Sequence, residues 1–219
     1  KKILKLYFDI ICKSMISCPE NFTHIIEKST DNHKHAIRLA DAFPEAKFIH
    51  LLKNPYSNLV SLRRYHNKIY GKPRFEKAVK IILDSYICSV ENTKKLGSRY
   101  LTIRYEDLIL DTKLCMKSIA NHIGVEYSDL MLMPTVEGSE WEGNSTLESQ
   151  IYDTKNFNKT GWKNDISRFE IALVNKSLQE YVEMYKYDVI RKGVFDTLAF
   201  SEEEGWMNYL KNRFLYLKS

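Results

Sequence analysis

The stretch AKFIHLLKNP, residues 46–55, decides the fold. Its apolar run is typical of a buried strand, and the run stops abruptly at Lys53-Asn54. Pro55 suits the first position of a helix, because the N–H that proline lacks has no partner there. Strand, polar turn and helix in this order indicate a unit of an α/β fold with a parallel sheet.

On both sides of this unit, the spacing of apolar residues and the positions of capping residues predict the remaining helices and strands. Asp111 is a predicted N-cap with Gly124 closing its helix, and Ser167-Arg168-Phe169-Glu170 reads as a capping box. The polar stretch 134–160 is predicted to be a loop. We expect strands at 23–30, 46–52 and 99–105, and helices at 1–16, 33–43, 56–70, 74–97, 111–123, from 168 onward and at 201–217.

Composition limits the class of protein. The chain has 219 residues, of which 44% are apolar and 12% aromatic, enough to close a sizeable core and to exclude disorder as a description of the whole. A net charge of +5 is too balanced for a protein that coats nucleic acid, and it favours a small anionic ligand. No window is apolar enough for a membrane span, and no secretion signal is visible, so the cytoplasm is the favoured compartment. The four cysteines lack metal-ligand spacing and are expected to be free thiols.

Polar groups at the ends of the strands are the candidates for chemistry, because ligands of open α/β sheets settle there. Lys53 leaves the 46–52 strand, and Ser61 follows roughly two helical turns later. A cation and a hydroxyl in this arrangement could converge on one phosphate at the start of the helix. The alternative is a surface lysine and an ordinary helical serine.

A second candidate phosphate cradle lies late in the chain. Lys159, Thr160 and Gly161 offer a cation, a hydroxyl and an unhindered backbone amide. Trp162 beside them could close over a purine, anchor the loop or plug the edge of the core.

Five segments, in order, resemble the sulfotransferases that use 3′-phosphoadenosine 5′-phosphosulfate (PAPS). Residues 43–65 are similar to the segment that binds the 3′-phosphate, a strand ending in Arg-Asp-Pro with a serine eight positions after the arginine. Around them, the family's other signatures have counterparts in IIEKST (25–30), RYLTIRYEDLILDTKLCMKSIANHIGV (99–125), NKTGWKNDIS (158–167) and the helix that begins RFEIALVNKS (168–177).

The resemblance covers about residues 25–188 and implies the family's fold and site. The fold would be α/β, a three-layer parallel sheet flanked by helices of the P-loop-like kind, in one domain over 1–219 with 189–219 as a helical extension. Lys53 and Ser61 would bind the 3′-phosphate together with the 159–162 loop. Tyr105 would lie near the adenine unless it is simply a core aromatic, and Lys28 would lie close to the sulfuryl group.

Two departures from the family pattern stand out. Lysine at 53 in place of arginine keeps the charge but loses the bidentate fork, so 3′-phosphate affinity is expected to be lower. The family's first element, a strand and a glycine-containing loop around the 5′-phosphosulfate, has no counterpart before Glu27, since the first glycine is Gly71. We therefore expect the fold to be incomplete at its N-terminus.

The base that would activate the acceptor is left open. Glu27 is a candidate because it lies beside Lys28, although a structural salt bridge explains it equally well. His50, inside the strand, is expected to be a core residue. The other histidine candidates are His24, His33 and His35.

The function expected from this resemblance is transfer of a sulfuryl group from PAPS to a hydroxyl or amine, without a metal. The acceptor would be a small molecule, glycan or peptide, with no nucleic acid partner and a homodimer as one possible assembly. The main rival is an inactive binding or scaffold protein of the same fold. A P-loop kinase relative is the weaker rival, because no Walker lysine or magnesium aspartate is discernible.

Overall fold

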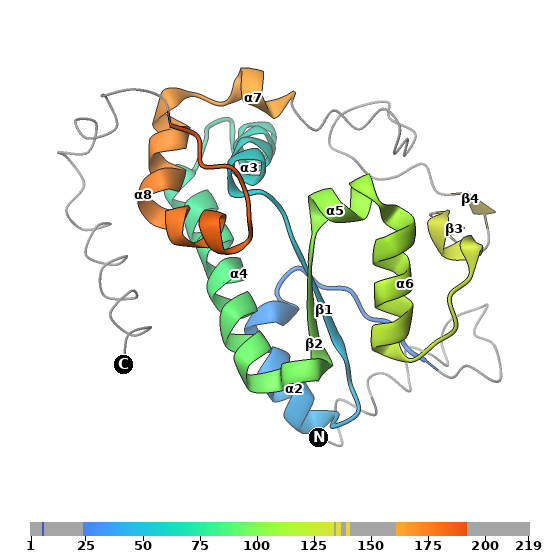
Figure 1. The fold of residues 1–219 in the computed structure, drawn as a ribbon. Coiled ribbons are helices and arrows are strands. Elements are labelled where there is room, and N and C mark those ends of the chain that lie inside the picture. The colour runs from blue at the N-terminus through green and yellow to red at the C-terminus, as the bar shows by residue number, and fades with distance from the viewer. Residues whose placement is uncertain (1–5, 7–23, 134, 137–138, 141–160, 192–219) are drawn as a thin grey trace. The chain divides into compact units, whose positions relative to one another are not determined.

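The structure is a computed structural model that describes residues 6, 24–133, 135–136, 139–140 and 161–191. The helices expected at 1–16 and 201–217 lie essentially outside this part. The described elements, drawn in Figure 1, are η1 (Asn32–Lys34), α2 (Ala36–Ala42), β1 (Phe48–Leu52), α3 (Pro55–Tyr70), α4 (Phe75–Leu96), η2 (Gly97–Arg99), β2 (Tyr100–Arg104), α5 (Tyr105–Leu110), α6 (Thr112–Ile123), η3 (Asp129–Leu132), β3 (Thr135–Val136), β4 (Ser139–Glu140), α7 (Trp162–Asp165) and α8 (Arg168–Met184).

The predicted strand, turn and helix at 46–70 are confirmed. β1 passes through Lys53 to Asn54, whose side chain accepts hydrogen bonds from the first backbone N–H groups of α3. Pro55 is the first residue of that helix. At the other end Gly71 closes α3 with φ of +68°, a left-handed conformation that a side chain would disfavour.

β1 and β2 are parallel neighbours, and helices pack on both of their faces (Figure 1). On one face, Thr102 and Tyr100 of β2 hydrogen-bond to Ser89 and Asn92 of α4. On the other, His122 of α6 reaches the β1 backbone at Phe48, with 3.1 Å between its Nε2 and the carbonyl oxygen. Helix, sheet and helix form three layers, as the sequence predicted.

The predicted capping residues act as caps. The Asp111 carboxylate accepts the Leu114 N–H at 3.0 Å, and Gly124 ends α6 with φ of +83°. Ser167 and Glu170 form the reciprocal capping box at the start of α8. The sequence predicted these helix ends correctly because each capping residue lies within a few positions of the backbone groups that it caps.

The strand expected at 23–30 is wrong. Residues 24–29 have no regular structure, and Ile25 and Ile26 are 49% and 83% exposed. Two adjacent isoleucines resemble a buried strand, but a strand also needs a neighbour to pair with. In the described residues β1 pairs with β2 and β3 with β4, and 24–29 pairs with neither sheet.

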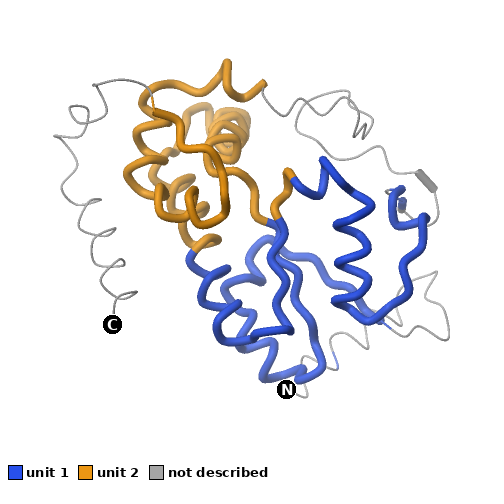
Figure 2. Tube along the Cα trace, in the orientation of Figure 1, with its two compact units in different colours: residues 1–51, 87–103, 107–156 blue, residues 52–86, 104–106, 157–219 orange. Residues whose placement is uncertain are grey.

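The chain forms two compact units, coloured separately in Figure 2. Unit 2 contains the ends of both parallel strands, α3, the first half of α4, α7 and α8. Its core includes Leu59, Val79 and Ile171, all fully buried. The single domain expected for the whole chain stays a prediction. Unit 1 is Lys1–Leu51, Ile87–Ile103 and Asp107–Asn156; unit 2 is Leu52–Tyr86, Arg104–Glu106 and Phe157–Ser219.

His50 is a core residue, as predicted, and lies in unit 1. Its Nδ1 is 2.8 Å from the Tyr100 hydroxyl, and its ring stacks on His33 with centroids 5.4 Å apart. Burial, reinforced by the neighbouring His33, lowers the pKa of His50 to about 4. The folded protein therefore holds this imidazole neutral.

Because of His50, the stability of the folded protein is expected to decrease as the pH is lowered. Between about pH 6.5 and pH 4 the unfolded chain binds a proton at this residue and the folded chain does not, so the unfolded state gains. The loss of unfolding free energy amounts to at most about 3 kcal/mol and should be complete near pH 4. Urea unfolding at a series of pH values measures it.

The matched variants are His50→Asn, which removes the titration but keeps a polar partner for Tyr100, and His35→Asn at an exposed histidine. We expect the first to flatten the pH dependence and the second to leave it unchanged. An equally steep dependence in His50→Asn would assign the effect to another group.

Candidate functional site

Lys53 and Ser61 lie together in unit 2. The chain leaves β1 at Leu52, and the following turn directs Lys53 along the first two turns of α3. Its Nζ donates a hydrogen bond to Ser61 Oγ at 2.9 Å. Both side chains are half-buried, so an ammonium and a hydroxyl meet at a partly sheltered point beside the start of a helix.

Tyr105, which directly follows β2, completes this group. It is the first residue of α5, directly after the strand, and it is half-buried rather than in the core. Lys53 Nζ lies 5.6 Å from the centre of its ring, within range of a cation–π interaction. Burial lowers the pKa of Lys53, the Glu106 carboxylate opposes that shift, and Arg64 adds to it. An anionic ligand here would replace the water that the ammonium has lost.

The turn that carries Lys53 is held by side chains distant in sequence. Glu106 accepts the Asn54 N–H with one carboxylate oxygen and the Tyr187 hydroxyl with the other, each at 2.9 Å. The Tyr86 hydroxyl donates to the Lys53 carbonyl at 2.9 Å. Glu106 therefore braces the turn that carries Lys53.

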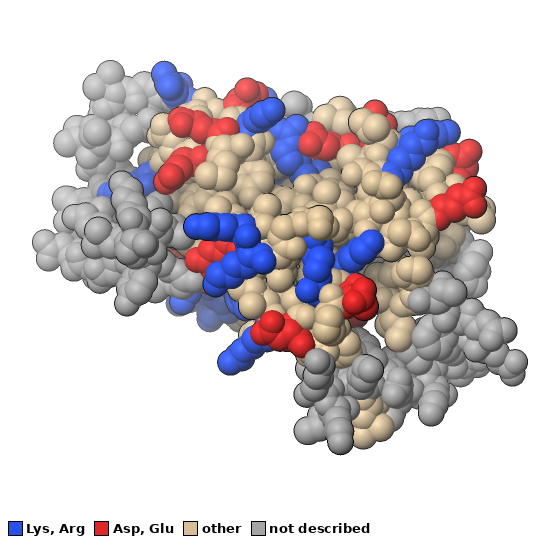
Figure 3. Space-filling model, turned by 60° about the horizontal axis from the view of Figure 1, so that its bottom comes forward, with Lys and Arg blue, Asp and Glu red and all other residues tan. Residues whose placement is uncertain are grey.

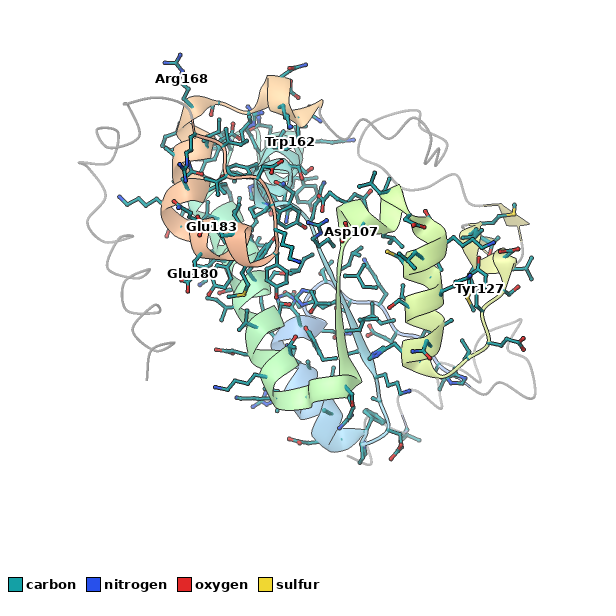
Figure 4. The ribbon with its side chains drawn as sticks, viewed as in Figure 1. Asp107, Tyr127, Trp162, Arg168, Glu180 and Glu183 are labelled. Atoms are coloured by element: carbon teal, nitrogen blue, oxygen red, sulfur yellow. The ribbon has the colours of Figure 1, made fainter. Side chains whose placement is uncertain are left out.

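The late loop is described only from Gly161 onward, so Lys159 and Thr160 lie outside the described residues. Trp162 begins α7, which packs on α3; its position is labelled in Figure 4. Its ring is parallel to that of Tyr56 in the first turn of α3, with centroids 6.1 Å apart. This stacking holds the start of α7 against α3 and leaves Trp162 half-buried, while contact with a purine stays a prediction.

Glu27 and Lys28 belong to unit 1, not to the unit of Lys53. Both are exposed, and Asn32 donates a hydrogen bond to the Glu27 carboxylate. His24 and His35 are also exposed, whereas His33 is half-buried against His50. The roles expected for Glu27 and Lys28 stay predictions.

Sequence reasoning overlooked two arginines that directly follow this site on α3. Arg63 pairs with the fully buried Glu170 of α8 at 3.1 Å, and Arg64 pairs with Asp165 of α7. Arg64 is close enough to Lys53 to lower its pKa. Two adjacent cations soon after a candidate phosphate-binding serine are a signal that could have revealed them.

Among the described residues, we find no cluster of histidine, cysteine or carboxylate side chains arranged to hold a metal ion. Within that same part of the chain, no helix has the length and apolar character to cross a bilayer. Both signs of charge are interspersed on the face shown in Figure 3. The cysteines in the described part of the chain, Cys88 and Cys115, are both half-buried.

Comparison with known families decides the assignment. The model of the sulfotransferase family matches residues 3–129, more than half of the chain. The chain belongs to the sulfotransferase family. This stretch of the sulfotransferase chain contains β1, the turn with Lys53, Ser61, β2 and the following Tyr105.

Individual sulfotransferases agree with the family match. The chain is 25% identical over 170 residues to the omega-hydroxy-beta-dihydromenaquinone-9 sulfotransferase Stf3 of Mycobacterium tuberculosis and to that of Mycobacterium bovis. The match covers 72% of this chain and 40% of each of those proteins, so the chain spans well under half of their length.

Two solved structures show the same fold. The sulfotransferase domain of the Synechococcus PCC 7002 olefin synthase matches with a TM-score of 0.56 and 22% identity, over 75% of this chain and 59% of that one. The sulfotransferase domain from the curacin biosynthetic pathway matches with a TM-score of 0.55 and 18% identity, over 85% and 69%. The predicted α/β sulfotransferase fold is confirmed.

Proposed function

We propose that this chain is part of an enzyme that transfers a sulfuryl group from PAPS to a hydroxyl acceptor. Family membership supports the reaction class. The observation that carries the choice of donor is the Lys53–Ser61 hydrogen bond, because it brings a cation and a hydroxyl to one point beside a helix start. The word hydroxy in the name of the mycobacterial relatives supports a hydroxyl rather than an amine acceptor.

In this proposal the 3′-phosphate binds where Lys53 now contacts Ser61. The lysine donates to one phosphate oxygen and the hydroxyl to another, so the pair trades its mutual contact for two charge-assisted hydrogen bonds. Tyr105 lies beside the adenine. Lys159, Thr160, Gly161 and Trp162 supply further contacts from the late loop, as the family resemblance implies.

The transfer step needs a base, a nucleophile and charge stabilisation. The acceptor oxygen attacks sulfur and forms a new S–O bond while the bond from sulfur to the 5′-phosphate oxygen breaks. A base takes the hydroxyl proton, and 3′-phosphoadenosine 5′-phosphate leaves. We assign the base to Glu27 and stabilisation of the sulfuryl group to Lys28; no step involves a metal ion.

Titration calorimetry with the intact protein tests the donor assignment. We expect 3′-phosphoadenosine 5′-phosphate to bind at least about tenfold more tightly than AMP, since one additional charge-assisted contact contributes roughly 1.5–3 kcal/mol. The two ligands share adenine, ribose and 5′-phosphate, so the comparison isolates the 3′-phosphate. Equal and weak binding of both would rule out the proposal.

A further inference from the structure

The segment that ends α3 and begins α4 carries an unusual concentration of charge. Residues 61–80 contain seven lysines and arginines against one acidic residue, Glu76, a net charge of +6. The whole chain carries only +5. All of the positive excess of the protein is therefore concentrated in these twenty residues.

Two of these seven cations pair with carboxylates, and the other five lie exposed at the surface. Arg63 and Arg64 pair with Glu170 and Asp165, as described above. We call the exposed residues Tyr65, Lys68, Ile69, Tyr70, Lys72 and Arg74 the α3–α4 corner.

Apolar side chains lie among the cations of the corner. Tyr65, Lys68 and Ile69 share one side of α3, because they are three and four positions apart. Tyr65 is 44% exposed, Ile69 53% and Tyr70 40%. Exposed aliphatic and aromatic groups next to lysines suit a surface that has an anionic layer above an apolar one.

Contacts with a buried histidine and with two cations hold the tyrosine rings of the corner in place. The His66 side chain is buried, and its ring lies 6.0 Å from that of Tyr65 and 5.8 Å from that of Tyr70. The Arg74 guanidinium lies on the Tyr70 ring at 3.8 Å, with Lys77 on the same ring at 5.9 Å. Tyrosine rings fixed in this way present their exposed parts without a large loss of side-chain entropy on binding.

The corner is also separate from the candidate nucleotide site. Ile69 lies eight residues beyond Ser61 on the same helix, roughly 12 Å along its axis. A nucleotide held at Lys53 and Ser61 does not account for it. The corner thus calls for a different ligand.

We propose that the α3–α4 corner binds the anionic surface of a lipid bilayer. Lipid phosphates attract the lysines and Arg74, while Ile69 and the tyrosine rings enter the boundary between headgroups and acyl chains. An acidic glycan would satisfy the cations and could stack on the tyrosine rings, but it has no apolar layer for an aliphatic side chain to enter, so the exposed Ile69 favours the bilayer. This inference goes beyond the proposed function and does not depend on it.

Vesicle sedimentation with the full chain tests the proposal. We expect binding to vesicles of equimolar phosphatidylcholine and phosphatidylglycerol at least about tenfold tighter than to phosphatidylcholine alone, weakening as salt rises. Lys68→Glu/Lys72→Glu should lose about tenfold or more of this binding. Lys94→Glu/Lys95→Glu, at exposed lysines in the last turn of α4, makes the same change in net charge and should bind like the unmodified protein.

A second variant tests the apolar part. Tyr65→Ser/Ile69→Ser keeps every charge and should weaken vesicle binding about fivefold. Thermal unfolding of each variant shows that it is folded. Equal binding to neutral vesicles, equal losses in the two lysine pairs, or binding to soluble heparin but to no vesicle would each overturn the proposal, the last in favour of a free polyanion.

Discussion

Replacing Lys53 by alanine is expected to weaken binding of 3′-phosphoadenosine 5′-phosphate about 10- to 100-fold. The lysine supplies a cation that hydrogen-bonds to Ser61, and a hydrogen bond to a charged group contributes roughly 1.5–3 kcal/mol. Its partial burial strengthens the effect, because a hydrogen bond to a charged group is stronger where the surroundings are less polar than water. Calorimetry of the variant with this ligand and with AMP measures the loss.

Three comparisons make the Lys53 result specific. AMP affinity should change far less, since AMP has no 3′-phosphate. Lys53→Arg should bind as tightly as the natural protein or more tightly, because a guanidinium can bind the phosphate with two parallel hydrogen bonds. Lys94→Ala removes an exposed charge elsewhere and should have no effect. Equal losses for both ligands would contradict the assignment of Lys53 to the 3′-phosphate.

Replacing Glu170 by alanine is expected to lower the free energy of unfolding by about 3 kcal/mol or more. Its carboxylate is fully buried, pairs with Arg63 of α3 at 3.1 Å and accepts the Ser167 N–H and hydroxyl of the capping box. The substitution removes the ion pair and the cap at once and leaves Arg63 without its carboxylate. Urea denaturation gives the change directly.

Glu180 provides the matched control on the same helix. It is exposed, as its labelled side chain in Figure 4 shows, so Glu180→Ala should change stability by less than about 0.5 kcal/mol. Glu170→Gln can still accept hydrogen bonds from Ser167 and should lose less than alanine. Similar effects of Glu170→Ala and Glu180→Ala would show that the Arg63 pair contributes little.

Local signals explain why much of the fold could be predicted. The Asn54-Pro55 start of α3, the Asp111 cap and the Ser167–Glu170 box each act on backbone groups within four residues. The 24–29 segment failed for the opposite reason. Its isoleucines have strand character, but pairing depends on a distant neighbour, which no local pattern can indicate.

In the candidate site, too, local sequence predicts some contacts and distant packing decides the others. Sequence alone indicated that Lys53 and Ser61 could meet, because a strand end followed by two turns of helix keeps them on one local unit, and the hydrogen bond between them shows that they do. Tertiary structure decided the rest: Tyr105 beside Lys53, Glu106 on the Asn54 N–H and Glu170 on Arg63. These partners are 52 to 107 positions apart, and only the packing of strands and helices around a shared core brings such residues together.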